Sequence, residues 1–403
     1  MRVAVIGGGI QGSCVAMELA DRGVEVDLIE SRSRLMDGAS RHTEGKIHLG
    51  FVYANDPTLK TADLMIRGAF SFAPLMRNWL GTAFEDVPLS SAFDYVVHPD
   101  SLLPADDLES VYKELAVRIR RAQADGEYFD IEAPYQIGRL DRDEIRPRYG
   151  DVVKDVFATQ EIAVDPEPVA NLVAKTVSDD SGIVVKLGTA VTAVDSVARS
   201  LHVTGLDGTE RTLGPYDHIV NCSWQGRPAI DATLGLIQNQ PWSFRMKYFA
   251  RLTKRRVDDR MPTATIVLGA FGDVVDYGTG DCYVCWYPVG RRGWSFALKP
   301  PEWPTRPDLA VAEKIVRESL ARLSKIIPKV NTFEVASADE LDVRGGVIYA
   351  LGTKDVDDAR SKFHQRSQVG VTSSGGWYHS VDTGKYTTAP VFAVEAANRI
   401  TQR

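Results

Sequence analysis

The first thirty residues alternate between short apolar runs and a glycine-rich, amphipathic stretch. Residues 1–6 form a short β-branched run that is typical of a buried strand. Apolar positions at helical spacing follow, at Cys14, Val15, Met17, Leu19 and Ala20. Gly23 is placed to end this helix, and residues 24–29 predict a second strand. The pattern therefore predicts a strand–turn–helix–strand unit of an α/β fold.

The turn between the first strand and the helix carries a glycine motif, Gly7-Gly8-Gly9-Ile10-Gln11-Gly12, which fits G-x-G-x-x-G. In this motif the first glycine permits a tight turn, the second admits a pyrophosphate, and the third lets the helix pack on the strand. Glu30 follows eighteen positions after Gly12, where a carboxylate can bind ribose hydroxyls. The expected dinucleotide contacts are Gly7, Gly9, Ile10, Gln11, Gly12, Glu30 and Ser31. The acidic residue disfavours NADP, but the motif alone leaves FAD and NAD open.

The rest of the chain mixes helical and alternating patterns, without internal repeats or low-complexity linkers. Helical periodicity covers residues 62–80, 105–123, 167–177, 309–327 and about 391–399. Strand-like patterns cover residues 189–194, 218–222, 246–252, 263–268, 282–289 and 294–298. The strands after residue 240 follow one another through glycine-rich turns, as in an antiparallel sheet.

Composition narrows the class of protein. The chain has 403 residues with 47 Lys+Arg against 54 Asp+Glu, and this net charge of −7 argues against nucleic-acid binding. No uncharged apolar run is long enough for a membrane helix, and we identify no signal peptide. Four cysteines are too few for a disulfide framework. We therefore expect a cytoplasmic protein of two or three domains.

Three further segments carry a resemblance to a known family. They are Gly38 to Gly50, Val220-Asn221-Cys222-Ser223-Trp224, and Gly384-Lys385-Tyr386-Thr387-Thr388, which precedes a helix. With the motif at residues 7–12, these segments resemble FAD-dependent oxidoreductases of the D-amino acid oxidase and glycine oxidase type. Residues 161–166 and 189–194 resemble further cofactor-binding segments of that family.

The resemblance implies FAD as the cofactor and assigns further contacts to it. It places Ser40 and Arg41 near the pyrophosphate, Val191 near the adenine, and Cys222 and Trp224 beside the adenosine. It places residues 46–50 near the isoalloxazine and the loop of Gly384, Lys385, Tyr386, Thr387 and Thr388 over the flavin. The positive end of the following helix would stabilise the charge of reduced flavin.

The resemblance also implies a domain organisation. A Rossmann-like FAD-binding domain of the GR2 type would be discontinuous, built from residues 1–58, 150–235 and 340–403. Residues 59–149 and 236–339 would form an inserted α+β substrate domain with an antiparallel sheet.

Several residues are candidates for chemistry at the flavin. Arg344 is the first candidate to anchor a substrate carboxylate, although it also fits a surface turn, and Arg245, Arg291 and Arg366 are weaker rivals. Lys46 and His48 stand two apart and would share one face of a strand, as proton acceptors or as charges that promote oxygen reaction. His48 also suits a covalent flavin link. Further candidates are Lys247, Tyr349 and His379. Cys282 and Cys285 would face opposite ways on a strand, so we interpret them as structural and predict no metal.

The leading functional hypothesis is oxidation of a C–N bond in a small polar amine or amino acid by hydride transfer to flavin N5, with O2 as the electron acceptor. Departures from common catabolic oxidases in residues 348–366 and 271–287 favour a specialised biosynthetic pathway. The alternative is a dehydrogenase of a hydroxy acid or polyol that passes electrons to a carrier, as the Gly-Lys-x-Thr-Thr pattern suggests. A third, non-enzymatic hypothesis is a flavin-bound scaffold or sensor.

Overall fold

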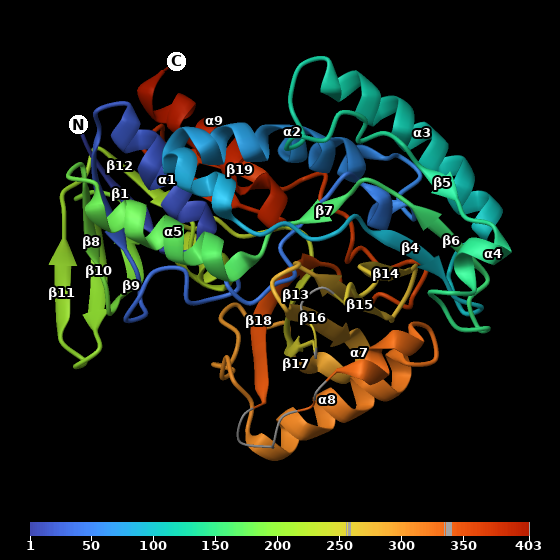
Figure 1. Cartoon of the computed structure of the whole chain (residues 1–403). Coiled ribbons are helices and arrows are strands. Elements are labelled where there is room, and N and C mark those ends of the chain that lie inside the picture. The colour runs from blue at the N-terminus through green and yellow to red at the C-terminus, as the bar shows by residue number, and fades with distance from the viewer. Residues whose placement is uncertain (255, 257–258, 334, 336–340, 403) are drawn as a thin grey trace.

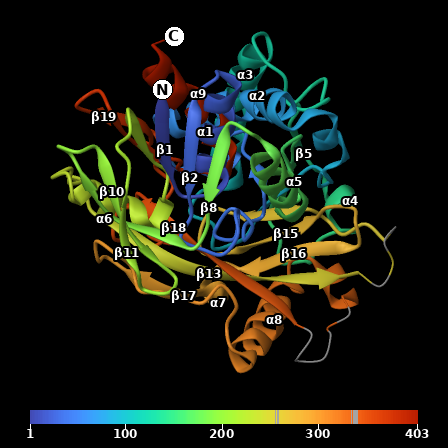
Figure 2. The ribbon, with the colours of Figure 1, turned by 90° about the vertical axis from the view of Figure 1, so that its left-hand side faces the viewer.

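A mostly parallel sheet forms the frame of the molecule. The structure is a computed structural model and describes residues 1–254, 256, 259–333, 335 and 341–402. The strand order of this sheet is β19-β20-β12-β1-β2-β8 (Figure 2). The strands are β1 (Arg2–Ile6), β2 (Glu25–Ile29), β8 (Ile183–Lys186), β12 (His218–Asn221), β19 (Gly370–Ser374) and β20 (Tyr378–Asp382). All neighbours pair in parallel except β19 and β20, which pair antiparallel at the edge.

The two faces of this sheet are covered by different layers, as the alternation of β1 shows. Val3 and Val5 pack with residues of the helices, whereas Ala4 and Ile6 pack with residues of a small antiparallel sheet. The helices are α1 (Ile10–Asp21), α5 (Pro166–Asp179) and α9 (Ala389–Thr401), and the small sheet is β9 (Thr189–Asp195), β10 (Ser200–Gly205) and β11 (Glu210–Leu213) (Figure 1).

A second, larger sheet extends from the lower centre to the right of Figure 1 and is mostly antiparallel. Its order is β17-β13-β16-β15-β14-β4-β6-β5, and β18 pairs with the same strand β13. The strands are β4 (Asp94–Val97), β5 (Gly138–Arg139), β6 (Asp155–Ala158), β13 (Trp242–Thr253), β14 (Ala264–Val267), β15 (Gly272–Asp276), β16 (Asp281–Trp286), β17 (Arg291–Ser295) and β18 (Asp342–Leu351). Helix α8 (Leu309–Leu323) packs on one face of this sheet through Ile315 and Val316. The opposite face shares the core of the parallel sheet through Phe249 and Tyr283.

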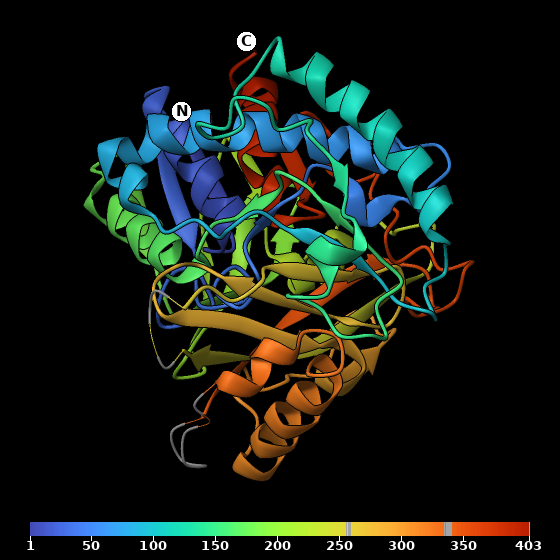
Figure 3. The same ribbon diagram turned by 45° about the vertical axis from the view of Figure 1, so that its right-hand side comes forward.

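The remaining elements close the molecule around the two sheets. Helices α2 (Lys60–Leu80) and α3 (Ala105–Gln123), blue and teal in Figure 3, run along one side, and orange α8 lies on the other. Shorter elements are β3 (Lys46–Ile47), β7 (Ile162–Ala163), α4 (Arg142–Ile145), α6 (Arg227–Ala232), α7 (Tyr287–Gly290) and η6 (Tyr386–Thr388). The N- and C-termini lie near one another in all three views.

The predicted α/β fold with an antiparallel sheet is confirmed, and the differences are local. The helix expected over residues 105–123 is α3. The strand expected over 282–289 ends at Trp286, because Pro288 starts the short helix α7. The segment between the strands expected over residues 263–268 and 282–289 contains a further strand, β15. Cys282 and Cys285 lie in different core clusters and are free thiols, as expected from their opposite faces.

The strand pairing differs from the expected domain boundaries at two strands. Strands β6 and β18 fall in segments assigned to the FAD-binding domain, yet both pair in the large sheet. We propose that the substrate domain includes these two strands. The boundary expected at residue 340 lies outside the described residues.

Candidate active site

One cavity of about 1250 Å³ runs from the glycine motif to the large sheet. That volume exceeds the ~300–1,000 Å³ of a pocket for one small ligand, which leaves room for a dinucleotide and a substrate. The predicted cofactor residues that line it are Gly7, Gly9, Ile10, Gln11, Glu30, Ser31, Ser40, Val191, Cys222, Trp224, Gly384, Lys385 and Tyr386. Lys46, His48 and Lys247 line it as well.

The glycine motif forms a cradle at one end of the cavity. Gly7 has a φ of 99°, which only glycine adopts easily. A Cβ on Gly12 would lie 1.8 Å from the Gly7 oxygen, so only glycine permits this contact between helix and turn. Helix α1 begins after Gly9 without a side-chain cap, and the Ile10 N–H donates to Ser40 Oγ at 2.9 Å. The helix N-terminus therefore presents N–H groups and positive dipole to the cavity, as phosphate binding requires.

The Glu30 carboxylate is held in place at the end of β2. Its Oε2 accepts from the Gly8 N–H at 2.7 Å, and its Oε1 accepts from the Arg32 N–H at 2.8 Å. Glu30 is buried but lines the cavity beside Ser31. The carboxylate is thus oriented before any ribose hydroxyl arrives.

The C-terminal loop is tied to the segment that passes Lys46 and His48. Thr387 Oγ1 accepts from the His48 N–H at 3.0 Å and donates to the Lys46 carbonyl at 3.1 Å. Gln11 Nε2 donates to the Ala389 carbonyl at 3.1 Å, which joins the first helix to the last. The Gln11 Oε1 atom is buried without a partner among the described residues. The N-terminus of α9 is therefore fixed beside the cavity.

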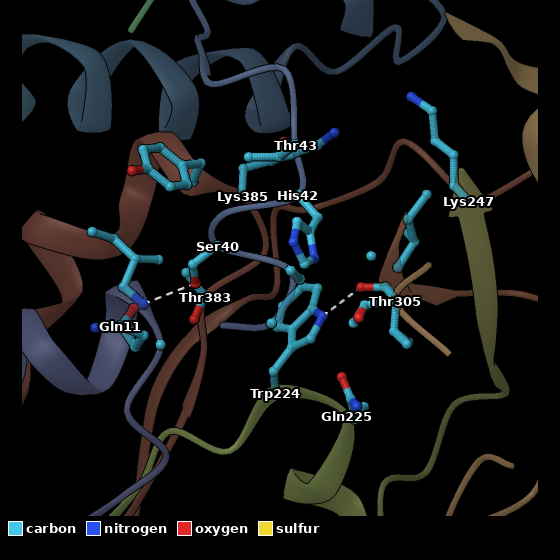
Figure 4. Close-up of a pocket in the computed structure, with 18 of the residues that line it drawn as sticks. Gln11, Ser40, His42, Thr43, Trp224, Gln225, Lys247, Thr305, Thr383 and Lys385 are labelled. Carbon is cyan, nitrogen blue, oxygen red and sulfur yellow. Dashed lines mark hydrogen bonds between the residues drawn. The ribbon is translucent and has the colours of Figure 1, made fainter. Parts of the chain in front are cut away.

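A cluster of charged side chains lies where the large sheet meets this loop. Figure 4 shows Lys385 on the C-terminal segment and Lys247 on strand β13, on opposite sides of the pocket. Burial would raise the pKa of Glu44, but Lys247, Lys385 and Lys46 hold it far below its ordinary value. Burial would lower the pKa of Lys247, but Cys285, Glu44 and Asp273 keep it above its ordinary value. Glu44 is therefore an anion and Lys247 a cation at neutral pH.

Lys46 is held by the large sheet. Its Nζ bonds Thr265 Oγ1 and lies 3.6 Å from Asp273 Oδ1, and it lies over the ring of Phe93 at 4.0 Å. Thr265 in turn donates to Asp273 at 2.7 Å. The Lys46 ammonium is thus engaged with the protein.

Other polar side chains at the cavity have atoms without partners. His48 Nδ1, His364 Nδ1 and Arg366 Nε are buried and accept or donate no hydrogen bond within the described chain. Burial lowers the pKa of His48 well below its ordinary value, and Lys385 and Lys46 add to the shift. His48 is therefore neutral at physiological pH. Buried polar atoms left unpaired in a cavity are the kind of group that a bound ligand satisfies.

Other predicted residues lie away from the cavity. Arg344 donates to Asp342 Oδ2 at 2.6 Å and pairs with Glu167, because β18 turns it toward α5. Tyr349 bonds Gln238 and accepts from Arg227 at 3.2 Å. Arg41, Gly12, Thr387 and Thr388 are also absent from the cavity lining. Arg41 bonds Asn171 at 2.9 Å, and the other three contact residues that support the lining.

His379 also lies away from the cavity, contrary to expectation. It was a candidate for chemistry at the flavin, but it lies on β20 with its Nε2 3.2 Å from His218 Nδ1 and its Nδ1 2.9 Å from Ser373 Oγ. It belongs to the sheet, because parallel pairing of β12 and β20 places the two histidines on neighbouring strands.

Several cavity residues had no sequence signal. Thr265 stood in a predicted strand without an expected role, and Asp273 and His364 stood in segments without a predicted element. Each reaches the cavity only through contacts between distant segments. Across the described residues, no group of three or more His, Cys, Asp or Glu could hold a metal ion.

The fold and the cradle together define a dinucleotide-binding oxidoreductase whose cofactor cleft opens onto an antiparallel sheet. The model of the FAD-dependent oxidoreductase family, DAO, matches residues 2–348, and the chain belongs to that family. Its cofactor is FAD, and the glycine cradle, the oriented Glu30 and the helix N-termini fit that group. No helix within the described residues is long and apolar enough to cross a membrane.

Solved structures share this fold at low sequence identity. Glycine oxidase from Geobacillus kaustophilus is similar with a TM-score of 0.72 and 14% identity, over 100% of this chain and 95% of that one. Iminodiacetate oxidase from Chelativorans sp. BNC1 is similar with a TM-score of 0.68 and 16% identity, over 100% and 96%. The curated bifunctional protein MnmC of tRNA 5-methylaminomethyl-2-thiouridine biosynthesis, from Shewanella denitrificans, is 46% identical over 46 residues, 11% of this chain and 6% of that protein.

Proposed function

We propose that the protein oxidises a C–N bond in a small amine that carries a carboxylate, such as an amino acid. The observation that supports this is one continuous cavity that joins the FAD cradle to unpartnered polar side chains on the large-sheet side. Bound FAD would accept the hydride from the carbon next to nitrogen at its N5 atom. The protein would bind, orient and desolvate the substrate.

Arg366 is our proposed carboxylate anchor, in place of Arg344. It lines the cavity, is 2% exposed, and its Nε has no partner in the described chain. A buried guanidinium without an anion is costly, and a substrate carboxylate would pair with it bidentately. Arg344, in contrast, already pairs with Asp342 and Glu167.

We propose O2 as the electron acceptor and His48 as a neutral donor or acceptor toward the substrate. The raised pKa of Lys247, kept above its ordinary value by Cys285, Glu44 and Asp273 against burial, leaves a cation at the cavity wall. Such a charge would stabilise the anion that forms when oxygen takes up an electron.

The four cysteines are buried free thiols, which supports a reducing cytoplasmic setting.

The alternative is oxidation of a C–OH bond with electrons passed to a carrier. It is supported by the Gly384–Thr388 loop pattern. The C–OH bond, though not the carrier, is also supported by similarity to L-alpha-glycerophosphate oxidase from Mycoplasma pneumoniae, with a TM-score of 0.63 and 14% identity. Both reactions use the same hydride acceptor, so they are distinguished by which compound, an amine or an alcohol, reduces the flavin.

An anaerobic reduction assay tests the proposal. The FAD-loaded protein is mixed with glycine, iminodiacetate, L-proline or glycerol 3-phosphate, and the absorbance of oxidised flavin is followed. We expect bleaching by at least one amine and peroxide release on return to air. Bleaching by glycerol 3-phosphate alone would favour the alternative, and a flavin that no amine reduces would contradict C–N oxidation.

A further inference from the structure

Lys46 and Lys385, two of the lysines that line the cavity, differ in what holds their ammonium groups. Lys46 bonds Thr265 and lies near Asp273. Within the described residues, Lys385 Nζ has no hydrogen bond or ion pair, and the nearest ring is that of Tyr53 at 6.0 Å. Its side chain is half-buried and lines the cavity.

Cationic side chains, two neutral histidines and one carboxylate surround Lys385. Lys46 and His48 face it from the segment after β2, Lys247 from β13, and Arg366 and His364 from the loop after β18. Glu44 is the anion in this group. Lys385 also directly precedes η6 and α9, whose N-terminal N–H groups add positive potential. Repulsion from Arg366, Lys247 and Lys46 favours the neutral amine at Lys385, whereas Glu44 favours the protonated form.

Burial lowers the pKa of Lys385 to about 8, with Arg366, Lys247 and Lys46 adding to the shift and Glu44 opposing it. The pKa of Lys247 moves in the opposite direction, because Cys285, Glu44 and Asp273 outweigh its burial. A general base works best when its pKa lies near the working pH. Of these two lysines, Lys385 therefore has the properties of a base and Lys247 those of a fixed cation.

We propose that Lys385 accepts the proton that the substrate ammonium must lose before oxidation, and that Glu44 is the counter-ion that stabilises the protonated lysine. One N–H bond breaks on the substrate and one forms at Lys385 Nζ, and no electrons change hands. The lone pair left on the substrate nitrogen is then free to form the C=N bond of the oxidised product. This step rests on the proposed C–N oxidation. Lys385 is a catalytic residue in this scheme, and Glu44 is a positioning residue.

Chemical labelling tests the titration of Lys385 without any substrate. The FAD-loaded and FAD-free proteins are pulse-labelled with acetic anhydride from pH 6 to pH 11, and Lys385 is followed by peptide mass spectrometry, with the exposed Lys113 as internal reference. We expect half-maximal labelling of Lys385 at about pH 8. In Glu44→Gln the midpoint is expected to fall by about one pH unit, because an attractive charge is lost. The exposed Glu132→Gln is the matched control and should leave it unchanged.

A midpoint near the ~10.4 of an ordinary lysine, unmoved by Glu44→Gln, would overturn the proposal. Failure to label Lys385 at any pH in either form would overturn it too, since a lysine that a small reagent cannot reach cannot take a proton from a substrate.

Flavin reduction tests the catalytic role with whichever of glycine, iminodiacetate or L-proline reduces the wild-type protein. Lys385→Arg keeps the charge but removes the base, so reduction at pH 8 should slow by ~10²–10⁴-fold while FAD stays bound. In the wild-type protein the rate of flavin reduction should rise with pH around pH 8. This rise should disappear in Lys385→Arg and move to lower pH in Glu44→Gln. An unchanged profile in Lys385→Arg would refute the role. If no amine reduces the wild-type flavin, the proposed reaction is wrong, and labelling alone decides whether Lys385 titrates near neutral pH.

Discussion

Replacing Gly12 by alanine places one methyl group between α1 and the first turn. The new Cβ would lie 1.8 Å from the Gly7 carbonyl oxygen and 3.3 Å from Val5 Cγ1. Ordinary contacts begin near 3.4 Å, so helix and turn must separate by more than an ångström. The obstacle is backbone, which cannot rotate away as a side chain would.

The cost follows from how tightly α1 is packed. Its residues from Ile10 to Met17 are all buried, so a shift of its first turn disturbs the core under the parallel sheet. Overpacking of this kind costs ~1–3 kcal/mol, and a backbone obstacle favours the upper end. The same shift moves the N–H groups at the start of α1 away from the pyrophosphate. A loss of about 1.4 kcal/mol there weakens FAD binding tenfold.

Two measurements on the same variant check this. Urea unfolding of the FAD-free protein should show a loss of about 2–3 kcal/mol for Gly12→Ala, and fluorescence titration should show FAD affinity at least tenfold weaker. Gly138→Ala is the matched control, because a Cβ at Gly138 would meet nothing within 4 Å. If Gly12→Ala binds FAD and unfolds like Gly138→Ala, the assigned role of the motif is wrong.

Two further predictions concern the arginines and the histidine pair. Arg366→Gln should raise the KM of a carboxylate-bearing substrate by roughly 10-fold or more, as expected for loss of a charged hydrogen bond of ~1.5–3 kcal/mol. Arg344→Gln should instead lower the stability against urea and leave KM unchanged. The opposite pattern would restore Arg344 as the anchor. Burial, with His218 adding, lowers the pKa of His379 from 6.5 to about 4. The unfolded chain therefore binds a proton at higher pH than the folded one, so stability should be complete above pH 6.5 and fall by up to about 3 kcal/mol toward pH 4. His379→Gln should flatten that part of the urea-stability profile, and an equal slope in both proteins would contradict it.

Local patterns were sufficient for the cofactor end of the cavity. Gly7 to Gly12 and Glu30 are close in sequence, and their spacing follows from the strand–turn–helix–strand unit that forms one end of the cavity. The family resemblance placed the loop at Gly384–Thr388 over the flavin, and Gly384, Lys385 and Tyr386 of this loop line the same cavity. These predictions depend on short-range geometry, which sequence spacing encodes directly.

The substrate end could not be predicted in the same way. Arg344 was preferred to Arg366 because it lies where the chain returns to the cofactor domain, but the pairing of β18 with β13 turns it toward Glu167. His379 failed similarly, since pairing of β20 with β12 placed it against His218. Strand pairing between distant segments decides which way such side chains point, and no local pattern reports it.

The charge on each cavity lysine depends even more on distant partners. Lys46, Lys247 and Lys385 come from the segment after β2, the large sheet and the C-terminal loop, and all act on Glu44. One lysine is bound by Thr265, another is held as a cation, and the pKa of the third is lowered to about 8 by burial and by its neighbours. Three residues of the same type thus acquire different properties only after folding. The Glu44→Gln substitution removes an attraction that raises the pKa of both Lys247 and Lys385. The labelling midpoints of both lysines should therefore fall, and that of Lys385 should be the one that moves closer to neutral pH. If both lysines kept their labelling midpoints in that variant, the cavity charges would act independently, and the division of roles argued above would fail.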